Sequence, residues 1–297
     1  MNLQMGLVLP TIGPGASRRS LLAGAGAAHD LGWASVWVTD HLLVPCGPEA
    51  EEYGTILEAL TSLTYVAARF GDLIVGTSVI VPPMRNSVIL AKELATLDIL
   101  SGGRLIVGVG VADRGDIGEF RNLGVEHRMS RRGALVDETI SLWRHLWSGG
   151  APPFAGEFHH LDDYVFQPLP PQGGAIPIWT GGRSDRALQR AALLADGYHA
   201  ARTGPEDLET RLPLLRRLCE EAGRPFPTLS IRTRVHFDAA PGDVYTICGS
   251  PSDMQRDVAR FAELGVEHLT VVLEETDPAR ITAAAHRFHT EVVQPLG

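Results

Sequence analysis

Two neighbouring residues, Asp40 and His41, stand where an apolar run of strand length, SVWVT at 35–39, comes to an end. A histidine beside a carboxylate can donate a hydrogen bond or exchange a proton near neutral pH, because its unperturbed pKa is about 6.5. The alternative is a polar strand end whose side chains bond only to nearby backbone groups. We therefore treat His41 as a candidate catalytic residue, with Asp40 beside it.

The turn formed by Gly181, Gly182, Arg183 and Ser184 is a second candidate, and it joins the apolar run IPIWT to a segment of helix length. Free backbone N–H groups at a helix start, a capping serine and an adjacent arginine form a natural cradle for a phosphate group. An ordinary strand-to-helix turn with a capping serine is the alternative. Because late strands of a barrel often bind phosphate, both interpretations stay open.

Other sequence patterns give weaker evidence for a catalytic or binding site. Gly108 and Gly110 are followed by a third glycine only at Gly115, so they do not form a dinucleotide-binding fingerprint. His159 and His160 are adjacent, and neighbouring side chains on a strand point to opposite faces, so we expect no metal site there. The chain has no GxSxG motif and no cysteine at a predicted strand end with a histidine partner, so nucleophilic hydrolysis is unsupported.

The segments that must position these residues alternate between strand-like and helix-like patterns from end to end, which is typical of βα units on a parallel sheet. We expect strands at 5–9, 35–39, 73–81, 105–111, 176–180, 198–201, 229–237 and 268–273, and helices at 17–31, 56–69, 87–100, 131–147, 184–194, 205–222, 251–264 and 278–293. These eight pairs, with no linker between them, predict an α/β fold with one domain over 1–297, a (β/α)8 TIM barrel. Its ligand site would lie at the carboxyl ends of the strands.

One segment, 149–174, breaks the alternation after the fourth βα unit. It is rich in proline and glycine and contains a predicted hairpin at 158–166, FHHLDDYVF. Long irregular insertions in compact domains are often lids or binding loops. We therefore expect it to close over the site.

The composition excludes several classes of protein. The 297 residues are 44% hydrophobic and 21% charged, enough for both a core and a wetted surface. A net charge of −9 argues against a nucleic-acid partner, because phosphate binding needs a basic face. No window approaches the ~18 apolar residues of a membrane span, and no signal-peptide pattern is visible, so no membrane association is expected. Three cysteines without a CxxC pair fit a cytoplasmic protein.

Three segments resemble the bacterial luciferase-like superfamily of flavin and deazaflavin oxidoreductases, and the likeness spans nearly the whole chain. They are LGWASVWVTDHLL at 31–43, the run at 75–112, and IPIWTGGRSDRALQRAALLADGYHA at 176–200. The middle segment is the most specific, with RN at 85–86, ATLD at 95–98 and SGGR at 101–104 matching the family pattern. The resemblance also implies a (β/α)8 barrel with an insertion.

Carried over residue by residue, the resemblance implies a flavin-type ring across the barrel mouth. Asp40 and His41 would lie near the reactive ring, with His41 donating a proton or orienting the substrate. Ser78 and Val79 match the position where relatives have a non-prolyl cis peptide behind the ring. The other implied contacts to the cofactor come from Val111, Ala112, Asp113, Gly181, Gly182, Arg183 and Ser184.

The resemblance leaves two cofactors open. Asp40 before His41 resembles the branch that uses the deazaflavin coenzyme F420, which passes a hydride, whereas FMN-dependent monooxygenases on the same scaffold react with O2. We favour F420 with a small-molecule substrate, and FMN with a separate reductase is the alternative. A non-catalytic flavin-binding relative is the rival from another class. A homodimer is usual for such relatives and is expected. Relatives often have Gly-Trp where this chain has Ala112-Asp113, which indicates a different substrate pocket.

Overall fold

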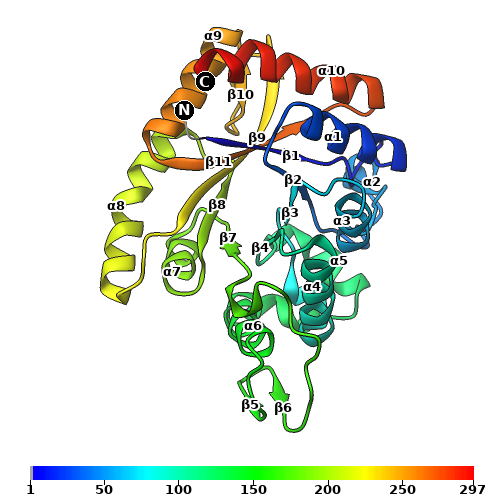
Figure 1. Cartoon of the computed structure of the whole chain (residues 1–297), viewed down its shortest axis with the longest axis vertical. Coiled ribbons are helices and arrows are strands. Elements are labelled where there is room, and N and C mark those ends of the chain that lie inside the picture. The colour runs from blue at the N-terminus through cyan, green and yellow to red at the C-terminus, as the bar shows by residue number, and fades with distance from the viewer. Residues whose placement is uncertain (1–2) are drawn as a thin grey trace.

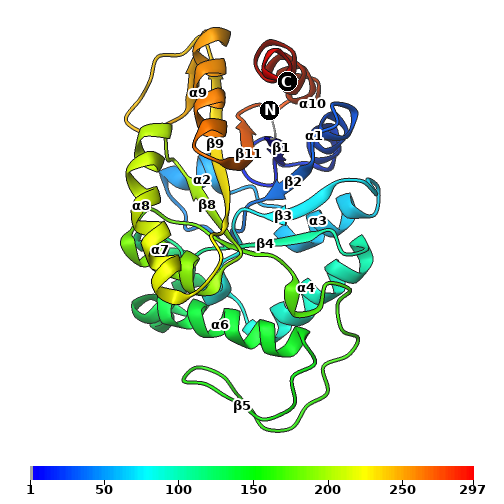
Figure 2. The same ribbon diagram turned by 60° about the vertical axis from the view of Figure 1, so that its left-hand side comes forward.

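Eight parallel strands close into a barrel in the computed structural model, which describes residues 3–297 apart from the side chains of residues 48, 49 and 52. Pairing of β9 with β8 and β11, and of β11 with β1, closes the ring. The predicted (β/α)8 barrel is therefore confirmed (Figure 2). The strands follow the order β1 (Gln4–Val8), β2 (Ser35–Val38), β3 (Ile74–Thr77), β4 (Leu105–Val109), β7 (Ile178–Thr180), β8 (Gly197–Ala201), β9 (Thr228–Phe237) and β11 (Val266–Leu273).

Helices surround the barrel on its outside (Figure 1). Several begin at a side chain that accepts hydrogen bonds from free backbone N–H groups, such as Ser17, Asn86 and Asp277. The main apolar core lies between helices and sheet, and no helix in residues 3–297 is long and apolar enough to span a membrane. The helices are α1 (Arg18–Asp30), α3 (Ala59–Ala67), α4 (Ser87–Ser101), α6 (Arg132–Trp147), α7 (Asp185–Leu194), α8 (Pro205–Ala222), α9 (Pro251–Glu263) and α10 (Pro278–Phe288).

Aromatic rings fill the inside of the barrel. Trp37 stacks on Trp179 with ring centroids 5.2 Å apart and on His199 at 5.1 Å. These rings fit because two facing residues are glycine: a Cβ atom at Gly76 would lie 2.3 Å from Trp37, and one at Gly197 would lie 2.3 Å from Trp179. The filled interior leaves the carboxyl-end mouth as the face on which a ligand can bind.

The third strand ends four residues earlier than predicted. The β-branched run at 73–81 continues past β3, but the ladder ends at Thr77, and the chain rejoins β4 only through an isolated bridge between Ile80 and Val109. Ile80 and Val81 are buried without extending the ladder, which is why their apolar pattern suggested a longer strand. Short elements absent from the prediction are α2 (Pro48–Tyr53), α5 (Ile117–Asn122) and β10 (Ile247–Gly249), which pairs with β9 outside the ring.

The insertion at 149–174 connects the end of α6 to the start of β7. Its hairpin pairs β5 (Phe154–Ala155) with β6 (His160–Leu161), so the predicted hairpin at 158–166 was misplaced. Glu138 of α6 accepts backbone hydrogen bonds from the turn at 157–159, and Gln172 bonds to Asp98 of α4. These contacts hold the insertion against α4 and α6, and its closure over the barrel mouth stays a prediction.

Candidate functional site

His41 follows β2 at the carboxyl end of the barrel, and its ring Nδ1 lies 2.8 Å from Oε2 of Glu119 on α5. Glu119 is buried, and its Oε1 accepts the backbone N–H groups of Leu42 and Leu43 at 2.5 and 2.9 Å. An ionised carboxylate can only accept, so Nδ1 of His41 carries the proton of this bond. Nε2 is then the ring atom available to a ligand.

Electrostatics at this pair favour the charged forms of both groups. The hydrogen bond to Glu119 raises the pKa of His41 above its ordinary value of 6.5, although burial opposes the shift. Burial would raise the pKa of Glu119, but hydrogen bonds from His41, Leu42 and Leu43 lower it overall. His41 therefore holds its second proton to a higher pH than a free imidazole, while 28% of its side chain stays exposed.

Asp40 is buried, and its carboxylate forms hydrogen bonds to neighbouring protein groups. Oδ2 accepts the backbone N–H of Val81 at 3.0 Å and Nε of Arg85 at 3.1 Å, and Oδ1 accepts Nη2 of Arg85 at 2.6 Å. Nη2 of Arg85 also lies 2.8 Å from Oε1 of Glu58. Asp40 therefore ties the end of β2 to the segment after β3, and its place near the cofactor ring stays a prediction.

The peptide bond between Ser78 and Val79 is cis, as the resemblance implied. Oγ of Ser78 lies 2.8 Å from Nε2 of His199, and Nδ1 of His199 lies 2.7 Å from Oγ of Ser230. Burial lowers the pKa of His199 to about 3, so its ring stays neutral, with one nitrogen donating and the other accepting. This buried chain of hydrogen bonds fixes the side chain of Ser78 toward the barrel interior.

The glycines of the GVGV run allow β4 to approach this segment closely. A Cβ atom at Gly108 would lie 2.0 Å from the carbonyl oxygen of Thr77, and one at Gly110 would lie 2.4 Å from Cγ2 of Val79. The backbone N–H of Ile80 donates to the carbonyl of Gly108 at 2.8 Å, and that of Gly110 donates to the carbonyl of Ile80 at 2.9 Å. These glycines therefore shape the surroundings of Val79.

The predicted phosphate turn lies at the start of α7, a ten-residue helix. Ser184 caps this helix by accepting a hydrogen bond from its first turn, and Gly182 has a φ of 115°. Across residues 3–297, the backbone N–H groups of Gly182 and Arg183 have no hydrogen-bond partner. Arg211 donates to the carbonyl of Arg183 and brings a second guanidinium to the turn. Gly181 lies against β8, where a Cβ atom would be 2.6 Å from the carbonyl oxygen of His199.

Val111, Ala112 and Asp113 lead the chain away from β4 at the mouth. Ala112 has a φ of 65°, in the left-handed region, and its carbonyl accepts Nε of Arg132 at 3.3 Å. Asp113 is exposed, and its side chain caps the next turn reciprocally with Asp116. The side chain of Asp113 is thus engaged in holding the turn.

Glu119 is the site residue that sequence reasoning missed. It belongs to a segment of mixed charge that resembled a solvated surface, and its partner His41 is 78 positions away, so no local spacing connects them. The available signal was its neighbour Phe120, which is fully buried and marks that helix as packed.

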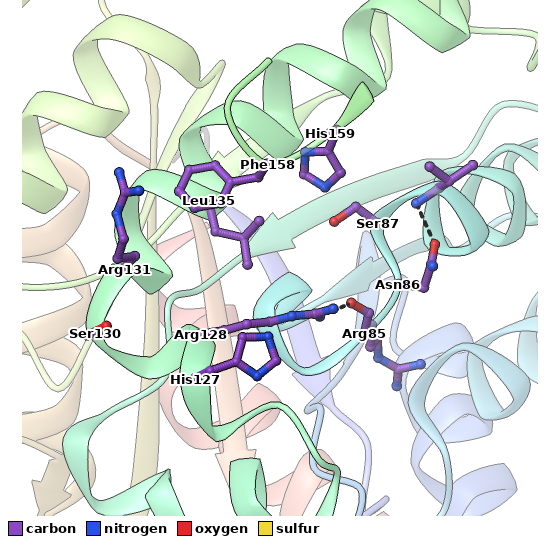
Figure 3. Close-up of a pocket in the computed structure, with 11 residues that line it drawn as sticks. Arg85, Asn86, Ser87, His127, Arg128, Ser130, Arg131, Leu135, Phe158 and His159 are labelled. Atoms are coloured by element: carbon purple, nitrogen blue, oxygen red, sulfur yellow. Dashed lines mark hydrogen bonds between the residues drawn. The ribbon is translucent and has the colours of Figure 1, made fainter. Parts of the chain in front are cut away.

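A cavity of about 460 Å³ lies beside the mouth, between the start of α4, the 127–135 segment and the hairpin of the insertion (Figure 3). Its basic side chains are already engaged: Arg131 pairs with Glu157, His159 pairs with Glu138, and Arg128 donates to the carbonyl of Arg85 at 2.8 Å. None of the site residues predicted from the sequence lines this cavity. We therefore place the candidate site at the barrel mouth.

Comparison with known proteins identifies the family of the chain and supports the fold. The family model described as luciferase-like monooxygenase matches residues 5–268. An F420-dependent glucose-6-phosphate dehydrogenase of Kineococcus radiotolerans is 33% identical over 223 residues, which cover 72% of this chain. That alignment spans 63% of the dehydrogenase, so the chain matches less than two thirds of the length of such relatives.

Solved structures with the same fold include enzymes of both cofactor types. An F420-dependent secondary alcohol dehydrogenase, solved with an F420–acetone adduct, superposes with a TM-score of 0.80 at 19% identity, covering 95% of this chain and 96% of that one. The oxygenating constituent of 3,6-diketocamphane monooxygenase from Pseudomonas putida, in complex with FMN, gives a TM-score of 0.78 at 16% identity. It covers 99% of this chain and 98% of the other. At these identities the likeness establishes the fold.

Proposed function

The chain belongs to the luciferase-like monooxygenase family, and from that premise we propose that it is an oxidoreductase transferring a hydride between coenzyme F420 and a small organic substrate. The observation that carries this proposal is the hydrogen bond between Nδ1 of His41 and Glu119. It leaves Nε2 of His41 available to a ligand at the carboxyl end of the barrel. The F420-dependent dehydrogenases among its relatives support the choice of cofactor. We also expect a homodimer.

The residues at the mouth fit a phosphate-bearing cofactor. The unpartnered N–H groups of Gly182 and Arg183, the start of α7 and the guanidinium groups of Arg183 and Arg211 would hold its phosphate. Ser78, Val79, Val111 and Ala112 would border the ring. When bound, F420 supplies the carbon that gains or loses a hydride, and the protein supplies position and electrostatics.

The chain's own contribution to the chemistry is the handling of one proton. An alcohol that becomes a carbonyl loses a hydride from carbon and a proton from oxygen. His41 Nε2 takes that proton in the oxidising direction and returns it in the reducing direction. Glu119 stabilises the imidazolium formed in between, because its carboxylate lies 2.8 Å from Nδ1.

Replacement of His41 tests the proposal. F420-dependent turnover would be assayed without oxygen, from the change in F420 absorbance, with 2-propanol and glucose 6-phosphate as trial substrates. We expect His41→Asn to lower kcat by about 10²–10⁴-fold and to leave F420 affinity within about threefold, since the phosphate is held elsewhere. His127→Asn, at an exposed histidine outside the mouth, is the control.

The alternative is FMN-dependent monooxygenation with reduced flavin from a separate reductase. The structural neighbour in complex with FMN supports this alternative. Oxygen consumption by the protein with chemically reduced FMN would favour it. Cofactor binding without turnover in any assay, and no effect of His41→Asn, would point to the non-catalytic flavin-binding relative.

A further inference from the structure

The guanidinium of Arg232 lies at the barrel mouth, and no carboxylate among the described side chains pairs with it. Side chains on β9 alternate, so Ser230, Arg232 and Arg234 share the inward face. Ser230 bonds to His199 in the buried chain below Ser78, and Arg232 therefore stands one step nearer the carboxyl end. Its Nη2 donates to Oγ1 of Thr39 at 3.1 Å, and Thr39 directly follows β2.

Two arginines near Arg232 pair with carboxylates. Nε of Arg234 lies 2.8 Å from Oε1 of Glu274, and Nη2 of Arg85 lies 2.6 Å from Oδ1 of Asp40. Among the side chains that the structure describes, which leave out those of residues 48, 49 and 52, Arg232 forms no salt bridge, and its enclosed Nε has no hydrogen-bond partner. Burial, with the positive charges of Arg234 and Arg202, lowers the pKa of Arg232 to about 10, and Tyr53 opposes this shift.

Burying a guanidinium without an anion is unfavourable, because the group loses its hydration and no opposite charge offsets that loss. Packing alone does not explain it, since an apolar side chain would fill the same space at a lower cost. Fork-shaped guanidinium groups match carboxylate and phosphate oxygens. The missing partner at Arg232 therefore corresponds to an anionic oxygen group of a ligand.

We propose that Arg232 binds a carboxylate or phosphate group of the substrate at the floor of the barrel mouth. The inference rests on the proposed function and narrows its substrate class. Thr39, which contacts Arg232, lies two positions before His41 in the chain. The substrate is thus an anionic alcohol or its carbonyl form, with its charged end toward Arg232 and its reacting oxygen toward His41.

Inorganic phosphate and acetate serve as probes, titrated calorimetrically into F420-loaded protein so that the cofactor's own phosphate occupies the α7 turn. We expect measurable binding of at least one ion, weakened at least about tenfold by Arg232→Gln, since a charge-assisted hydrogen-bond pair is lost. Arg234→Gln, on the same face of β9 but neutralised by Glu274, is the matched control and should change affinity less than about twofold.

Arg232→Met tests folding separately. Because the substitution removes an enclosed charge, this variant should unfold at the same temperature as wild type or higher, with an unchanged circular dichroism spectrum. Loss of ion binding in this well-folded variant would support the proposal.

Three results would overturn it. The first is no phosphate or acetate binding by wild type, and the second is equal ion binding by wild type and Arg232→Gln. The third is weaker F420 binding by Arg232→Gln with unchanged ion binding, which would assign the anion to the cofactor. If F420 itself does not bind wild type but phosphate binds the apo-protein through Arg232, the proposed function fails and the anion site stands.

Discussion

At the residue scale, Glu119 sets the pH up to which His41 keeps its second proton. The carboxylate raises the pKa of His41, so the neutral base needed for alcohol oxidation is populated only at higher pH than for a free imidazole. Oxidation should therefore increase as pH rises through the pKa of His41, and the reverse reduction should fall.

Replacing Glu119 by Gln should move this pH dependence. Without the carboxylate, the pKa of His41 falls toward its ordinary value of 6.5, so the rising limb of kcat/KM for oxidation shifts to lower pH. The amide can still accept from Leu42 or Leu43, which limits the loss of structure. A pH profile with its limb unmoved would show that Glu119 does not act through His41.

Asp40 should matter more for stability than for proton transfer. Asp40→Asn leaves the guanidinium of Arg85 enclosed with a weaker partner, and we expect the free energy of unfolding to fall by about 3–5 kcal/mol. Glu58→Gln removes the other, 35% exposed partner of Arg85 and should cost about 1 kcal/mol or less. Urea denaturation of both variants measures the difference, and equal losses would contradict the assignment.

At the element scale, close contact between β4 and the segment after β3 shapes the mouth. Gly110→Ala places a Cβ atom 2.4 Å from Cγ2 of Val79, which must move. We expect unfolding free energy to fall by about 1–3 kcal/mol and F420 affinity to weaken. Gly115→Ala has no atom within 4 Å of its new Cβ and serves as the control. Unchanged F420 affinity in a folded Gly110→Ala variant would show that Val79 does not contribute to the cofactor site.

The insertion at 149–174 can be loosened without touching the mouth. Glu138→Gln weakens the hydrogen bonds that hold the hairpin turn at 157–159 against α6. Amide exchange in that turn should become faster, while the KM for substrate and the affinity for F420 stay the same. An increase in KM on this substitution would instead support closure of the insertion over the site.

At the scale of the whole molecule, local patterns were enough for the barrel and for the placement of His41, Ser78 and Ser184. Alternating apolar runs give strands and helices because each element buries one face. The ends of β3 and β4 could not be read in this way, since Ile80 is buried outside the ladder. Glu119 and Arg232 were missed because their meaning depends on partners brought together only by the closed sheet.

The central claim, that the mouth holds F420, is tested most directly by titrating the apo-protein with F420 and, separately, with FMN, and following fluorescence. The account predicts an F420 dissociation constant of about 1 µM or tighter, with FMN weaker by at least about tenfold. Tight binding of FMN with no binding of F420 would contradict it and direct the search to oxygen-consuming reactions.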